Sequence, residues 1–146
     1  MAKPLTTTSH ALLGLLSIQP WSTYELAKQV DRSLGWFWPR TERKIYDEAK
    51  KLVERGHATS ASETTGSRPR TVYKITAKGR RTLQAWLDEA SAPPKLEAEA
   101  LVRVCFADAG TLDQLHATID DLAAKAHANL DELRALIATA DHADYP

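Results

Sequence analysis

The sequence predicts a mainly α-helical fold, in which a winged helix-turn-helix domain precedes a region of two C-terminal helices. Three helical patterns come first, followed by two β-type segments around a polar loop. The proline pair at residues 93–94 then separates this part from two more helical patterns. The charge divides similarly: residues 1–81 carry 15 Lys and Arg against 7 Asp and Glu, whereas the remainder carries 4 against 12. The basic half suggests a polyanionic partner, and the alternative is chance clustering of surface charge.

Composition narrows the class of protein. A chain of 146 residues is long enough for one domain or two very small ones. No apolar run approaches the roughly 20 residues of a membrane helix, and residues 1–4 lack the pattern of a signal peptide. Cys105 is the single cysteine, so an intrachain disulfide is excluded. We therefore expect a cytoplasmic protein without a membrane partner.

The first helix is predicted to end at Ile18, because the following Gln19-Pro20 dipeptide disfavours helical backbone. Its N-cap candidates are Thr7, Thr8 and Ser9. The stretch between is apolar on nearly every face, which predicts a buried helix.

The second helix begins with a capping box, in which Ser22 and Glu25 each satisfy the other's backbone amide. We expect it to run to about Asp31. Residues 32–39 contain three aromatic side chains and a helix-stopping proline, which predicts a turn.

The third helix is predicted between Thr41 as N-cap and Gly56 as a left-handed C-cap. Its apolar positions recur at helical spacing: Ile45, Ala49, Leu52 and Val53.

A hairpin and a fourth helix complete the domain. Residues 57–62 form a weak strand candidate, residues 63–69 a polar loop, and residues 71–75 a stronger, β-branched and aromatic strand. Thr76 is placed to cap the next helix, whose inward residues are predicted to be Leu83, Trp86 and Leu87. The linker at residues 91–94 places the domain boundary between residues 1–91 and 92–146.

Two helices are predicted beyond the linker. The first spans about residues 95–108 and should be buried over its apolar stretch, residues 100–107. Gly110 ends this element, and Thr111 with Gln114 forms a second capping box. Apolar residues of the last helix are three or four positions apart, close to a coiled-coil seam. A lone helix cannot bury such a seam, so we expect a homodimer formed through Leu101, Phe106, Leu115, Ile119, Leu122, Leu130, Leu133 and Ile137.

The order of three helices and a hairpin is that of a winged helix-turn-helix, and its physics suits duplex DNA. The third helix opens with Arg43 and Lys44 and lacks an acidic N3 residue, so its amides and positive dipole end are available to phosphates or base edges. Glu42 either pairs with cytosine or favours the helix dipole. The recognition-helix candidates are Thr41, Arg43, Lys44, Tyr46, Asp47 and Lys50, and the wing candidates are Arg68, Arg70 and Lys74. Taken singly, a basic helix or a basic loop is more often a solvated face than a DNA-binding element, and their combination in this order within the basic half favours DNA.

The same stretches resemble the PadR family of transcriptional regulators. They read SHALLGLLS, TYELAKQV, WFWPRTERKIYDEAKKLVERG, RPRTVYKITAKGRRTLQAWL and LEAEALVRVCFAD. The resemblance implies a homodimer that represses its own or a neighbouring gene by reading an inverted-repeat operator with paired third helices. It also implies that Tyr46 touches the DNA backbone. The chain departs from the family pattern at Thr23, Ala49 and Ala58, which stand where glycine, leucine and a bulky residue are usual. These departures predict a less filled core beneath the wing.

Other functions find less support in the sequence. Catalysis is not expected, because the sequence shows no nucleophile with its base and no glycine-rich phosphate loop. No cofactor or metal is expected either, since no two of the five histidines are four residues apart. Trp86 and Phe106 either line a small-molecule effector pocket or pack in a core. The alternative to a DNA-binding repressor is a protein-interaction module whose winged helix no longer binds DNA.

Overall fold

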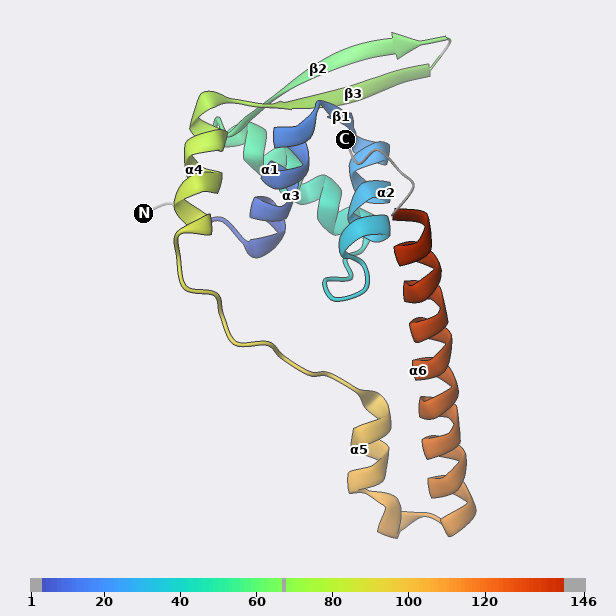
Figure 1. The fold of residues 1–146 in the computed structure, drawn as a ribbon. Coiled ribbons are helices and arrows are strands. Elements are labelled where there is room, and N and C mark those ends of the chain that lie inside the picture. The colour runs from blue at the N-terminus through green and yellow to red at the C-terminus, as the bar shows by residue number, and fades with distance from the viewer. Residues whose placement is uncertain (1–3, 67, 141–146) are drawn as a thin grey trace. The chain divides into compact units, whose positions relative to one another are not determined.

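The computed structural model describes residues 4–66 and 68–140, and the chain divides after Ser91 into two compact units (Figure 1). The first unit holds α1 (Thr7–Ile18), β1 (Trp21–Ser22), α2 (Thr23–Leu34), α3 (Glu42–Glu54), β2 (Ala58–Thr65), β3 (Arg68–Ile75) and α4 (Ala77–Leu87). The second holds α5 (Glu99–Cys105), the 3₁₀ turn η1 (Ala107–Ala109) and α6 (Leu112–Ala140). The element order confirms the predicted mainly α-helical fold with a winged helix-turn-helix.

The three strands form one antiparallel sheet in the order β1-β3-β2. β3 pairs with the short β1 through Trp21 opposite Tyr73, and with β2 along its whole length. The β2–β3 hairpin extends past the helices of this unit as a two-stranded wing (Figure 1).

The core of the first unit lies between its helices and the base of the wing. Its fully enclosed apolar side chains come from α1, α2 and α3: Leu12, Leu13, Leu26, Ala49 and Leu52. Tyr73 and Ile75 of β3 and Leu83 of α4 complete the same cluster. Because four helices and the base of the wing contribute to one core, the orientation of α3 is fixed by the packing of the whole unit.

Most helix starts follow the sequence signals. The Ser22–Glu25 capping box is present, and Thr41 and Thr76 cap α3 and α4 as predicted. The predicted cap of α1 was wrong, because the Thr6 hydroxyl, and not residues 7–9, accepts the capping hydrogen bond, from the amide of Ser9. α2 also continues to Leu34, three residues past its expected end.

The wing is longer than the sequence predicted. Residues expected to form a loop extend β2 and β3 in eight consecutive pairs, from Ala58 opposite Ile75 to Thr65 opposite Arg68. Gly66 turns the chain with a φ of 66°, in the left-handed region that favours glycine. Ser67, part of the expected loop, lies outside the described residues. The expected inward position of Leu87 was wrong as well, since that side chain is exposed at the end of α4.

The second unit consists of α5 and η1 connected to the 29-residue helix α6. The predicted capping box is present: the Thr111 amide donates to Gln114 over 2.8 Å, and the Gln114 amide to the Thr111 hydroxyl over 3.2 Å. The prediction of one buried helix over residues 95–108 was wrong. α5 is only seven residues long, and Leu101, Val104, Cys105 and Phe106 are exposed. Within the described ranges, no helix combines the length and apolar character needed to cross a membrane.

Candidate nucleic-acid interface

α3 has one buried face and one exposed face. Ile45, Ala49 and Leu52 enter the core. Arg43, Asp47 and Lys50 are exposed, and their spacing of four and three residues places them on one stripe opposite that core. This stripe carries three of the six predicted recognition-helix residues and offers two cations and one carboxylate to a partner.

The remaining predicted residues of α3 take other positions. The Thr41 hydroxyl accepts the Lys44 amide over 3.3 Å, so one amide of the first turn is engaged within the protein. Tyr46 is half-buried and packs against the core. The Lys44 ammonium donates to Glu48 on the next turn over 2.9 Å.

Glu48 is the buried polar centre of this region, with 1% of its surface exposed. Its Oε1 accepts from Lys44 and from Lys51, the latter over 3.0 Å. Its Oε2 accepts from the Thr6 hydroxyl over 2.8 Å and from the Ser9 hydroxyl at the start of α1. Burial by itself raises the pKa of this carboxyl, but its four hydrogen bonds outweigh burial and lower the pKa to about 2.

Sequence reasoning missed Glu48. The available signal was its position, because Glu48 is three residues after Ile45 and four before Leu52, on the apolar face of the helix. A carboxylate on that face must be buried with partners, since an unpaired buried charge is strongly destabilising.

The segment before α3 is held to α1 by an aromatic and a cation. Trp38 Nε1 and Arg40 Nε both lie 3.3 Å from the Thr8 hydroxyl, to which both donate. The Arg40 guanidinium also stacks over the Trp38 ring, 4.1 Å from its centre. This arrangement places an exposed cation beside the N-terminus of α3, and the sequence analysis had assigned no role to Arg40.

The wing carries Arg68, Arg70 and Lys74 on β3, all exposed. Arg70 is partly neutralised by carboxylates: its guanidinium lies 3.2 Å from Glu63 on β2 and 3.8 Å from Glu25 on α2. Arg70 therefore joins the wing to α2.

His10 and Trp86 connect the first and fourth helices. Their rings stack at a centroid distance of 4.8 Å and an angle of 5°. Trp86 also packs against the core, which favours the packing role over an effector pocket for this residue. Among the residues that the structure describes, no cluster of histidine, cysteine and carboxylate side chains is suited to a metal ion.

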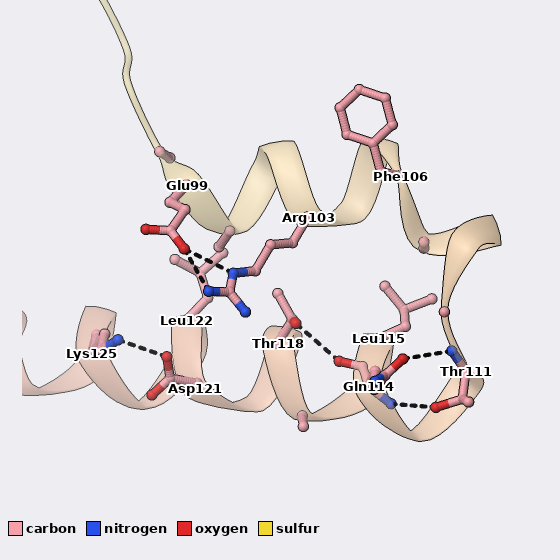
Figure 2. Close-up of a pocket in the computed structure, with 15 residues that line it drawn as sticks. Glu99, Arg103, Phe106, Thr111, Gln114, Leu115, Thr118, Asp121, Leu122 and Lys125 are labelled. Atoms are coloured by element: carbon pink, nitrogen blue, oxygen red, sulfur yellow. Dashed lines mark hydrogen bonds and ion pairs between the residues drawn. The ribbon is translucent and has the colours of Figure 1, made fainter.

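The second unit presents the apolar residues that the sequence assigned to dimerisation. Leu101, Phe106, Ile119, Leu122, Leu130, Leu133 and Ile137 are exposed, and Leu115 is half-buried. A hollow of about 760 Å³ lies along α5, η1 and α6. Leu115 and Leu122 point from α6 toward α5, whereas Phe106 points away from α6 (Figure 2). Ion pairs between Arg103 and Glu99 and between Lys125 and Asp121 add charged groups to its lining.

Comparison with known proteins places this architecture among regulators. The model of the transcriptional regulator PadR-like family matches residues 12–85. The chain is 34% identical over 87 residues to the probable transcriptional regulator Rv1176c of Mycobacterium tuberculosis, covering 59% of this chain and 46% of that protein. It is 27% identical over 127 residues to the negative transcriptional regulator PadR of Bacillus subtilis, covering 86% of this chain and 70% of that protein.

Solved structures share the fold of this chain. Bacillus subtilis PadR in complex with operator DNA superposes with a TM-score of 0.81 at 25% identity, covering 92% of this chain and 79% of that one. The same protein in complex with p-coumaric acid superposes with a TM-score of 0.71 at 23% identity, covering 100% and 78%. These relatives are transcriptional regulators, not enzymes.

Proposed function

The chain belongs to the PadR-like family of transcriptional regulators, and on that premise we propose that it represses transcription as a homodimer bound to an inverted-repeat operator. The first unit binds the DNA and the second holds the two copies together. The observation that carries the proposal is the exposed stripe of Arg43, Asp47 and Lys50 on α3, opposite the core.

The stripe suits direct reading of base edges. A recognition helix contacts bases mainly through its N-terminal residues, and arginine pairs with the O6 and N7 acceptors of guanine. Arg43, in the first turn of α3, is therefore assigned to a base. Asp47 is one turn further along and matches the amino group of cytosine. Lys50 lies near the far end of the stripe and takes a phosphate.

The wing and Tyr46 fix the position of the protein on the duplex. Arg68 and Lys74 are exposed on β3 and neutralise phosphates beside the recognition helix. Arg70, already paired with Glu63 and Glu25, mainly orders the wing and contributes a weaker phosphate contact. Tyr46, at the edge of the core, directs its hydroxyl to the DNA backbone, as the family resemblance implies.

The second unit supports the dimer through its exposed apolar residues. An apolar row along 29 residues of α6 cannot be covered by the seven residues of α5. A second copy related by twofold symmetry covers it with the same residues. The two recognition helices then enter successive major grooves, with half-sites about 10 bp apart.

The proposal of repression, and of its release by a small molecule, is supported by the named relatives. One is a negative regulator and has been solved both with operator DNA and with p-coumaric acid. We propose that this chain likewise blocks transcription when bound and that a small-molecule effector weakens its binding to DNA.

Mobility shift with the DNA upstream of its own gene tests the proposal, followed by sequencing of genomic fragments that the protein retains. Binding should yield a twofold-symmetric site and fall steeply with salt, because bound cations release counterions from DNA. No retention of any fragment at low salt would refute DNA binding and favour a protein-interaction module.

A further inference from the structure

We propose that Glu48 is a positioning residue that sets the discrimination between operator and random DNA by holding Lys44 and Lys51 away from phosphates. The inference rests on the proposed function, because it presumes that α3 meets DNA. It concerns a residue that faces the core and not the DNA.

The contacts of Glu48 divide between its two oxygens. Oε2 faces the start of α1 and accepts the hydroxyls of Thr6 and Ser9. Oε1 faces along α3 and accepts both ammonium groups, from one turn before and one turn after. One buried carboxylate thus anchors the recognition helix to α1 and holds two of its lysines.

The two lysines occupy one flank of α3. They are seven residues apart and therefore share a face, between the buried residues and the stripe of Arg43, Asp47 and Lys50. Their side chains remain 43% and 47% exposed, so solvent reaches them although Glu48 itself is enclosed.

This geometry affects the two kinds of DNA differently. Random DNA binds through phosphates alone, and a mobile lysine adds to that binding wherever a phosphate is near. A lysine held by Glu48 can reach such a phosphate only by leaving a buried carboxylate short of a partner, which is unfavourable. Operator binding relies on Arg43 and its stripe and is less affected. Glu48 therefore suppresses non-specific affinity.

The substitution Glu48→Gln removes the negative charge of the side chain and keeps its shape. The amide keeps the size of the carboxyl, and its NH₂ group can donate to the hydroxyl oxygens of Thr6 and Ser9. The two lysines lose their anionic partner. Glu54→Gln is the matched control, because it removes the same charge from an exposed position of the same helix.

Affinities for the operator and for a random duplex are measured across a salt series. In Glu48→Gln we expect random-DNA affinity to rise about tenfold and the magnitude of its salt slope to increase by about 1 to 2, as up to two more phosphates are neutralised. Operator affinity should change less than about threefold, so discrimination falls. Glu54→Gln should keep the wild-type ratio. An unchanged ratio in Glu48→Gln, including a parallel rise or fall of both affinities, would overturn the proposal.

A second measurement on the wild-type protein covers the case in which Glu48→Gln does not fold. Nuclear magnetic resonance of the lysine ammonium groups should show slow hydrogen exchange for Lys44 and Lys51 and fast exchange for the exposed Lys50. Equal exchange at all three would overturn the proposal. This readout needs no DNA, so a failure of the Glu48 network is distinguished from a failure of operator binding.

Discussion

Gly79 offers a sharp test of how the wing is joined to the helices. It lies in the first turn of α4, where a Cβ would overlap the His57 carbonyl oxygen and lie 2.8 Å from Cγ1 of Ile75. The same carbonyl accepts the Thr76 amide over 3.0 Å. A methyl group here therefore pushes against backbone that is already fixed by a hydrogen bond at the base of the wing.

The magnitude follows from two opposed effects. Overpacking costs about 1–3 kcal/mol, and a clash with backbone belongs at the upper end because no rotamer change relieves it. Replacing glycine by alanine within a helix stabilises the folded state by about 1 kcal/mol. Gly79→Ala should therefore lower the free energy of unfolding by about 2 kcal/mol.

Gly14 in α1 supplies the matched control. Apart from the adjoining backbone of its own helix, no atom of the described residues lies within 4 Å of a Cβ built there, so Gly14→Ala should stabilise the protein by up to about 1 kcal/mol. Urea unfolding followed by circular dichroism measures both variants. Shifts of the two midpoints in the same direction would refute the close packing of α4 against His57 and the end of β3.

Three further predictions concern DNA, assembly and acid. Arg43→Ala should weaken operator binding by about 1–3 kcal/mol and relax base preference at one position of each half-site, as selection from a randomised pool would reveal. Leu122→Asp should give monomers in sedimentation experiments and weaken DNA binding, and an unchanged dimer mass would contradict this. Because the folded pKa of Glu48 is depressed to about 2, the stability that this carboxylate provides is present above its ordinary pKa and is lost as pH falls from about 5 toward 2. Burial lowers the pKa of His10 and His57, so a smaller loss of folding stability should begin as pH falls below about 6.5, where these histidines are protonated in the unfolded chain. Urea unfolding midpoints measured across pH would check the Glu48 and the histidine predictions.

Helix starts that depend on local chemistry were predictable from the sequence. Ser22, Thr41 and Thr76 each cap the helix that follows, through hydrogen bonds within four residues. The cap of α1 was misplaced although it is equally local, since the Thr6 hydroxyl accepts the Ser9 amide three residues further on. Residues 6–9 are four adjacent hydroxyl residues, and a local pattern does not choose among them.

The wing was underestimated for a different reason. Residues such as Ser62 and Glu63 are polar and exposed, and their strand is held by backbone pairing with β3, not by an apolar face. Alternation of apolar and polar residues is the main sequence signal for a strand, and a two-stranded hairpin with two solvated faces need not show it. The basic residues of the wing were recognised, whereas the acidic partners of Arg70 were not. The pairing with Glu63 depends on strand register, and the pairing with Glu25 depends on how α2 packs beside the wing.

The error in the second unit carries the most information about assembly. Residues 100–107 were expected to be buried, and within one chain Leu101, Val102 and Val104 of α5 are exposed. The apolar pattern of a sequence reflects all the surface that is buried in the functional assembly. In the second unit, one copy has only α5 and α6 to pack together, so it buries less apolar surface than an assembly of two copies would. If the exposed residues of α5 and α6 become covered when two copies associate, the expected burial of residues 100–107 is met between chains. The sedimentation experiment on Leu122→Asp thus tests the burial argument as well as the dimer, since a monomeric wild-type protein would leave that apolar surface without an explanation.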